Sequence, residues 1–230
     1  MSLVDYKVPF RSEAFIAEIA MKCWRIGTVP GSKQVDLKVI LTELEAHGVE
    51  SIAHIHGMRR KGRLKIEIID DCADPSPACV DFRPTLKLRV QQATWQRFQL
   101  GHSEERVIIA HEIGHILLHS DQAKRFSRDP TVQIQFAENE DSAEGQANLF
   151  ADHLLIPTHI ATQLNDVDRL AFICNVPEDF ARDRLTGGGH DKYQYAWSSY
   201  ATGAPCANCG DFSVIGPFGR RRCTSCGGCG

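Results

Sequence analysis

The sequence predicts an α+β fold, in which helices pack on a small mixed sheet and a cysteine-rich module follows. Apolar residues recur at helical spacing both before and after a block in which β-branched and polar residues alternate. Five of the nine cysteines crowd into the last 25 residues of the 230-residue chain. We therefore expect a main domain over 1–186, a linker over 187–204 and a small module over 205–230.

Composition and charge place the chain in a broad class. A hydrophobic fraction of 43% and a charged fraction of 24% are typical of a soluble globular protein. The net charge of -3 gives no sign of a nucleic-acid binder as a whole. The chain starts without a basic region followed by an apolar run, and no apolar run approaches the roughly 20 residues that span a bilayer. We expect a cytoplasmic protein with no membrane association.

Two short amphipathic helices are expected near the start of the chain. The first covers 11–27, where apolar residues recur every three or four positions up to Gly27. The second covers 35–48, with Asp36 as its N-cap and Gly48 as its stop. Each helix has one apolar face to bury.

Strand signals follow the two helices. The segments 49–57 and 63–71 carry alternating β-branched residues, and both are predicted to be strands. The segment 70–84 contains three prolines and is predicted to be an irregular loop. The segment 85–95 begins with the period-2 alternation of a half-exposed strand.

The second half of the main domain is predicted to be helical. One helix opens at Ser103, and another covers 142–156, stopping before a proline. Three short helices are expected to follow before residue 186, the first of them capped by Thr158.

The stretch IIAHEIGHILLH, residues 108–119, carries the most specific chemistry. It places His111, Glu112 and His115 in the spacing H-E-x-x-H. On a helix, positions i and i+4 lie on one face, so the two imidazoles can bind one ion, and Glu112 can reach a water at that ion. Zinc suits this ligand type best. The helix is apolar nearly all round, and burying this trio without partners would cost several kcal/mol.

A third metal ligand is expected from the helix over 142–156. It offers Glu144, Asp152 and His153, of which Glu144 is favoured and His153 points the opposite way. Asn148 lies one turn beyond Glu144, where its side-chain oxygen can accept the N–H of a ligand histidine. Asp152 is the alternative for either role.

His119 continues the series of histidines at i+4. Three successive i+4 positions on one helix diverge from a single ion. We therefore expect His119 to lie next to the metal ligands rather than to bind the metal itself.

The two helical motifs together resemble a known family. HEIGHILLH followed by AEGQANLFADHLLIP is similar to the ImmA/IrrE family of metallopeptidases, whose signature is H-E-I/L-G-H-x-x-x-H and then E-x-E-A-N-x-F-A-x-x-L-L-M-P. The resemblance covers roughly 29–185. Gln146 stands where the family usually has a second Glu, and Ile156 where it usually has Met.

The resemblance implies a zincin-like metallopeptidase domain and a function. It implies Glu144 as the third ligand of a catalytic zinc and Glu112 as the general base. Members of this type cleave, or promote the cleavage of, helix-turn-helix repressors. The expected function is therefore a zinc-dependent endopeptidase that acts on such a transcriptional repressor, in stress response or in mobile-element or phage regulation.

A substrate platform is also expected. The strand over 86–91 can serve as the sheet edge on which an extended substrate adds as a further strand. The predicted substrate-binding residues are Leu86, Lys87, Leu88, Arg89 and Val90.

The C-terminal cysteines form two C-x-x-C-G knuckles, with 13 residues between Cys209 and Cys223. This pattern is typical of a zinc ribbon, in which four thiolates on a structural zinc supply the folding energy. The predicted ligands are Cys206, Cys209, Cys223 and Cys226, with Cys229 as a possible substitute. The alternative is a tail of reduced free cysteines.

Three arginines, Arg220–Arg222, precede a predicted cysteine ligand. They can contact nucleic acid, face solvent or dock a protein partner. A second function therefore stays open, namely a non-proteolytic regulator that uses the zincin scaffold and the ribbon to bind a protein partner or DNA.

Overall fold

The computed structural model describes residues 8–53, 62–74, 76–119 and 142–187, and two short strands near the C-terminus. Within these ranges no helix combines the length and apolar character needed to cross a membrane. The elements of the main body, in chain order, are α1 (Glu13–Gly27), α2 (Leu37–His47), the 3-10 helix η1 (Val49–Ser51), β1 (Lys65–Ile69), β2 (Ala78–Asp81), β3 (Lys87–Gln91), α3 (Gln92–Gln99), α4 (Ser103–Leu118), α6 (Ala143–Leu155), α7 (Thr158–Leu164), α8 (Val167–Cys174) and α9 (Glu178–Thr186).

The predicted α+β class is confirmed, and the first two helices form as expected. Ser12 caps α1 by accepting from the Phe15 amide, and Asp36 caps α2 by accepting from the Lys38 amide. α2 ends at Gly48, whose φ of 82° suits a residue without a side chain. Local capping signals therefore fix both ends of α2.

The three strands form the predicted small mixed sheet, in the order β1-β3-β2. β1 runs parallel to β3, and β2 runs antiparallel to it. The alternating apolar residues of β2 and β3 are buried, whereas the polar residues between them are half-buried. One face of this sheet therefore packs into the core.

Two strand predictions are corrected. The predicted strand over 49–57 is wrong at its start, where Val49–Ser51 form a 3-10 turn that the Ser51 hydroxyl closes by donating to the Gly48 carbonyl at 2.8 Å. The predicted loop over 70–84 contains β2. Pro77 and Pro84 lie outside the strand, and the Pro77 carbonyl still accepts the Gln91 amide at 2.9 Å.

Helix α3 is a further difference, because the segment 85–95 is not one long strand. The chain turns into α3 immediately after β3. Gln91 gives α3 no side-chain cap, and the Asp71 carboxylate accepts the Ala93 amide instead, at 2.9 Å. This cap comes from another loop, so the local sequence does not reveal it.

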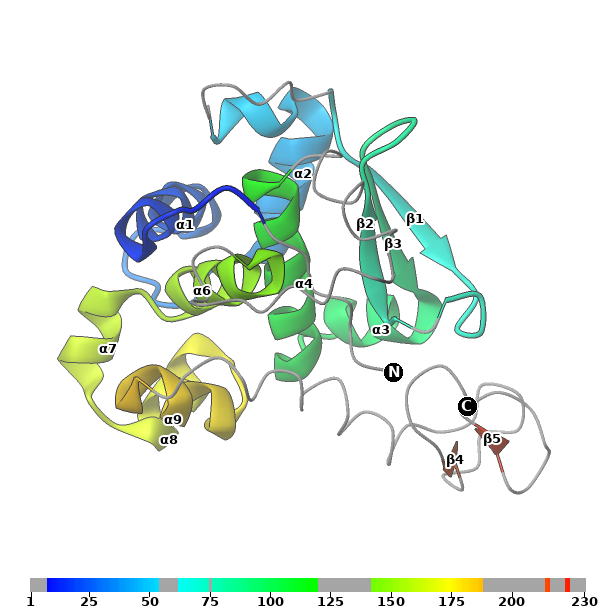
Figure 1. The fold of residues 1–230 in the computed structure, drawn as a ribbon. Coiled ribbons are helices and arrows are strands. Elements are labelled where there is room, and N and C mark those ends of the chain that lie inside the picture. Colours follow the sequence, from blue (N-terminus) through cyan, green and yellow to red (C-terminus); the bar gives the residue numbers. More distant parts are fainter. Residues whose placement is uncertain are drawn as a thin grey trace.

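Helix α4 lies at the centre of the molecule, between the sheet and the helices α1 and α6 (Figure 1). It is buried nearly all round, as its sequence predicts. Gly114 lets α6 approach closely, because a Cβ at this position would lie 3.1 Å from the Cα and the carbonyl oxygen of Ala147. The two helices that carry the site residues are therefore packed backbone to backbone.

The helices after α4 also form largely as predicted. Ser142 caps α6 by accepting the Gly145 amide at 2.8 Å, and α6 ends before Pro157. The prediction that Thr158 caps α7 is wrong, because Pro157 occupies the N-cap position and Thr158 is the first helical residue. The Thr158 hydroxyl instead accepts from Arg184 of α9 at 3.0 Å.

Near the C-terminus the described part is a two-stranded antiparallel pair, β4 (Val214–Ile215) with β5 (Arg222–Cys223). The remainder of the predicted linker and cysteine module lies outside the described residues. The same holds for the side chains of all four predicted cysteine ligands, including that of Cys223 in β5.

Candidate metal centre

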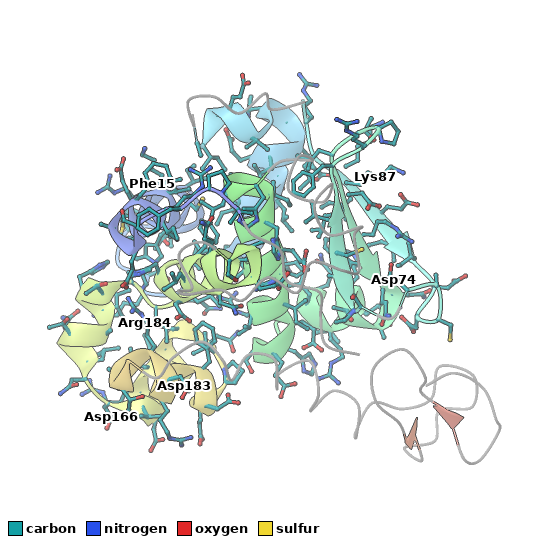
Figure 2. All side chains as sticks on the ribbon, viewed as in Figure 1. Phe15, Asp74, Lys87, Asp166, Asp183 and Arg184 are labelled. Carbon is teal, nitrogen blue, oxygen red and sulfur yellow. The ribbon has the colours of Figure 1, made fainter. Side chains whose placement is uncertain are left out.

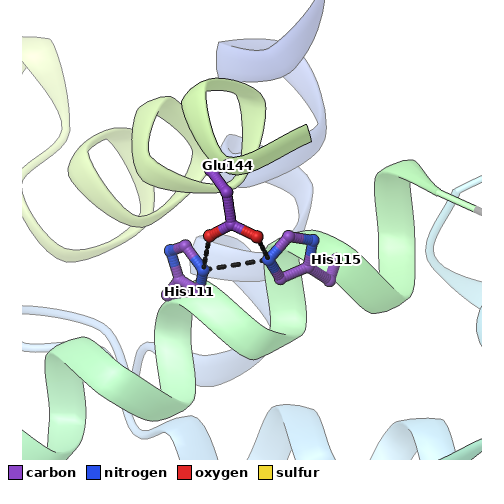
Figure 3. Close-up of side chains that lie close together, drawn as sticks. All are labelled: His111, His115 and Glu144. Carbon is purple, nitrogen blue, oxygen red and sulfur yellow. Dashed lines mark hydrogen bonds and ion pairs between the residues drawn. The ribbon is translucent and has the colours of Figure 1, made fainter. Parts of the chain in front are cut away.

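Helices α4 and α6 bring His111, His115 and Glu144 together (Figure 3). The Nε2 atoms of the two histidines lie 2.9 Å apart. The Glu144 carboxylate oxygens lie 3.2 Å from Nε2 of His111 and 3.4 Å from Nε2 of His115. The three side chains thus direct two imidazole nitrogens and a carboxylate at one point, the arrangement that the sequence predicts.

Asn148 orients the first histidine. Its Oδ1 lies 2.7 Å from Nδ1 of His111, one helical turn beyond Glu144 on α6. A histidine that offers Nε2 as a ligand carries its proton on Nδ1, so Nδ1–H donates to Asn148. The predicted contact of Asn148 with a ligand histidine is therefore present.

His119 lies beside His115 and does not join the three converging groups. Its Nδ1 is 3.0 Å from Nδ1 of His115, and its Nε2 is 3.2 Å from Oε1 of Gln146. The predicted geometry, in which a third i+4 histidine diverges from the ion and supports a ligand, agrees with these contacts. The contact of Gln146 with His119 is not predicted from helix geometry, because two residues along a helix point Gln146 away from Glu144.

Burial and charge oppose each other at these residues. Burial lowers the pKa of His111, but the hydrogen bond and charge of Glu144 outweigh it, so this pKa is raised. Burial raises the pKa of Glu144, but the two histidines outweigh it and hold that pKa well below its usual range. Burial and the neighbouring His115 lower the pKa of His119 well below its ordinary value. These directions favour an ionised carboxylate between the two histidines, and a neutral His119.

Glu112 is buried next to His111 on α4, with 4% of its surface exposed. Its charge acts on two neighbours from different elements, because it raises the pKa of His111 and that of Cys79 in β2. Burial is the larger cause for Cys79, whose pKa rises to about 12. The charge of Glu112 thus acts on both a histidine of α4 and a cysteine of the sheet, and its effect on Cys79 is one that sequence reasoning missed.

The predicted substrate platform is corrected. The prediction that 86–91 form the sheet edge is wrong, because β3 is the central strand and pairs with both β1 and β2. The apolar residues of this segment, Leu86, Leu88 and Val90, are buried in the core. The residues between them, Lys87 and Arg89, form ion pairs with neighbouring side chains. A strand with two neighbours cannot accept a third.

Asp152 is buried on α6, and the charges that act on it come from α1 and α9. It is two turns from Glu144, about 12 Å along α6. The charges that act on it are those of Arg184, Asp183 and Glu13. The charges that act on Asp152 therefore do not include those of the converging histidines, and its role beside the metal ligands stays a prediction.

His153 belongs to the same group of side chains. Its Nε2 lies 2.9 Å from a Glu13 oxygen, and the Arg184 guanidinium lies 3.0 Å from its Nδ1. Arg184 projects from α9 toward α6 and α7 (Figure 2), where it also donates to the Ile156 carbonyl. This group ties α1, α6 and α9 together.

Asp152 makes the stability of the fold depend on pH. Burial raises its pKa from 3.8 to about 8, against the opposing charge of Arg184. Between these values the folded chain keeps a proton that the unfolded chain has lost, so the free energy of unfolding falls as pH rises. We expect Asp152→Asn to remove this slope, which amounts to at most about 1.4 kcal/mol per pH unit.

Urea unfolding of both proteins at pH 5, 6, 7 and 8 measures this effect. The advantage of Asp152→Asn should grow with pH across the series. Asp168→Asn, at an exposed carboxylate in the first turn of α8, is the matched control and should show no such growth. An advantage that stays constant with pH would contradict a neutral Asp152.

The three converging groups fit a zinc ion. Their ligand atoms all lie within 4.8 Å of one another, close enough to bind a single ion. Two imidazole nitrogens and one carboxylate form a ligand set of catalytic zinc sites, which leave a further position open. Asn148 and His119 supply the outer hydrogen bonds that such histidines need.

A comparison with protein families supports this interpretation. Residues 98–186 match the model of a peptidase family described as the IrrE N-terminal-like domain. No curated protein and no solved structure matches the chain significantly. The matched stretch runs from the end of α3 to the end of α9, so it contains all three converging residues. The match supports the resemblance to the ImmA/IrrE family and points to a metallopeptidase as the kind of function.

Proposed function

We propose that the chain is a zinc-dependent endopeptidase and that its substrate is a helix-turn-helix transcriptional repressor. The proposed peptidase activity rests on the convergence of His111, His115 and Glu144 on one point, with Glu112 buried next to His111 in the sequence. A site that served only to hold a metal would not need a further carboxylate at this place. The repressor rests on the family resemblance alone.

Each residue has a distinct task in this proposal. His111, His115 and Glu144 would hold the zinc, which when bound polarises the scissile carbonyl and stabilises the negative charge that develops on it. Asn148 and His119 fix the two imidazole tautomers by accepting their Nδ1–H groups. Glu112 takes a proton from the attacking water and then transfers it to the leaving amine.

The substrate proposal is tested by incubating the zinc-loaded chain with purified helix-turn-helix repressors. We expect one of them to be cut into two fragments, whose masses locate the cleaved bond. Removal of zinc with a chelator should stop the reaction, and re-addition should restore it. A chain that cuts unrelated unfolded proteins but no repressor would retain the peptidase proposal and overturn the substrate proposal.

We propose a second, structural zinc in the C-terminal module. Its ligands would be Cys206, Cys209, Cys223 and Cys226, as the two knuckles predict. The proposal rests on the spacing of the cysteines. Metal analysis of a Cys206→Ser, Cys209→Ser double variant should give one zinc per chain fewer than the parent.

A further inference from the structure

We infer that His119 and Gln146 are positioning residues that link the metal ligand His115 to the N-terminal segment Val8–Arg11. Zinc binding and docking of this segment should then stabilise each other. The inference rests on the metal site of the proposed function. It goes beyond that function because it adds a part of the chain that neither the ligand set nor the general base requires.

A continuous series of hydrogen bonds carries the inference. Nδ1 of His115 lies 3.0 Å from Nδ1 of His119, whose Nε2 lies 3.2 Å from Oε1 of Gln146. Nε2 of Gln146 then donates to the Pro9 carbonyl at 2.9 Å. His115, His119 and Gln146 are all buried, so these polar groups interact with one another away from solvent.

The use of His115 as a ligand sets the direction of every bond in the series. A metal on Nε2 requires the proton of His115 on Nδ1, where it can only donate. Nδ1 of His119 must then accept, which places the proton of His119 on Nε2. That proton goes to the amide oxygen of Gln146, so the amide nitrogen is left to donate to Pro9. Without the metal, either tautomer of His115 is allowed and the series loses this constraint.

The N-terminal segment also contacts its surroundings at Val8 and Arg11. Val8 is 5% exposed and packs with Ala143 at the start of α6, whereas Phe10 is 62% exposed. The Arg11 guanidinium lies over the Phe15 ring, 5.4 Å from its centre, and its charge reaches His119. The bond from Gln146 thus joins the segment to the interior beside the site. A modest change in this bond should therefore be visible in the segment.

Gln146 is the residue that separates the two halves of the series. A carboxylate at this position would still accept from His119, but it could not donate to the Pro9 carbonyl and would repel it. Gln146→Glu should therefore keep His115 supported and release the segment. His119→Asn keeps an acceptor close to the position of Nδ1 but is too short to reach Gln146, so it should break the series one step earlier.

The test uses the full chain with and without one equivalent of added zinc. Hydrogen exchange is followed in peptides covering 8–16, and zinc affinity is measured by competition with a chelator. In the parent, zinc should slow exchange of this segment about tenfold. In Gln146→Glu and in His119→Asn this effect of zinc should disappear, while zinc affinity falls less than about tenfold. Gln96→Glu, at an exposed site on α3, is the matched control and should behave as the parent.

A spectroscopic measurement separates positioning from a general loss of structure. Cobalt in place of zinc reports the ligand geometry by its visible absorption. His119→Leu leaves the His115 Nδ1–H without an acceptor, so it should shift this spectrum and weaken metal binding about 10- to 100-fold. His119→Asn should restore both toward the parent.

The outcomes distinguish the inference from the function on which it rests. A parent chain that binds no zinc at His111 and His115 would overturn both. A parent that binds zinc there, but whose N-terminal exchange does not respond, would overturn the link alone. So would a Gln146→Glu or His119→Asn variant that keeps the full response.

Discussion

Replacing Glu112 by glutamine is expected to slow peptide cleavage by about a hundredfold to ten-thousandfold, the contribution of a positioned general base. Glutamine has nearly the same size as glutamate but cannot take a proton from water. Glu112 is not one of the groups that converge on the ion position. Zinc content should therefore remain that of the parent while cleavage is lost.

The decisive comparison is between zinc content and cleavage rate in one preparation. Glu178→Gln, the same change at an exposed site on α9, should leave both unaltered. Unchanged cleavage by Glu112→Gln would show that another group is the base. Loss of zinc together with cleavage would show that Glu112 acts on the metal site itself.

Replacing Glu144 by alanine is expected to abolish stable zinc binding at the main site. Removal of an outer hydrogen-bond partner typically costs 10- to 100-fold in metal affinity, so removal of a ligand should cost at least about a hundredfold. Glu144 supplies the only negative charge among the three converging groups. Cleavage should fall in proportion to the zinc that is lost.

Chelator competition measures this affinity, and the thermal midpoint gives an independent readout. Zinc that binds only the folded chain raises the midpoint, so Glu144→Ala should show little of the increase seen in the parent. Asn148→Ala is the matched comparison on the same helix face and should lose affinity to a smaller degree. If Glu144→Ala bound zinc as tightly as the parent, the third ligand would have to be a residue other than Glu144.

Local signals predicted most of what surrounds the site. The Asp36 cap and the buried character of α4 follow from short stretches of sequence. The meeting of His111, His115 and Glu144 follows from i+4 spacing on one buried helix and one carboxylate on the next. Asn148 could be predicted for the same reason, since it lies one turn from Glu144.

The missed features depend on contacts between distant segments. The prediction that β3 lies at the sheet edge is wrong because strand order is set by packing between distant segments. β2 is not predicted because prolines flank it in the sequence, and prolines indicate a loop. The start of α3 depends on Asp71, which is 22 residues away from its bonding partner. Asp152 shares a helix with the site, but the charges that act on it come from α1 and α9. The contacts of Gln146 with His119 and with the Pro9 carbonyl depend on how distant segments pack, so the local sequence does not predict them.

The most direct test of the metal centre is the zinc content of the full chain compared with that of His115→Ala after exhaustive dialysis. Measured by elemental analysis, the variant should contain one zinc per chain fewer than the parent, whatever the C-terminal cysteines bind. The expected loss follows from the place of His115 Nε2 among the three converging groups. Equal zinc content in the two proteins would contradict the centre formed by His111, His115 and Glu144.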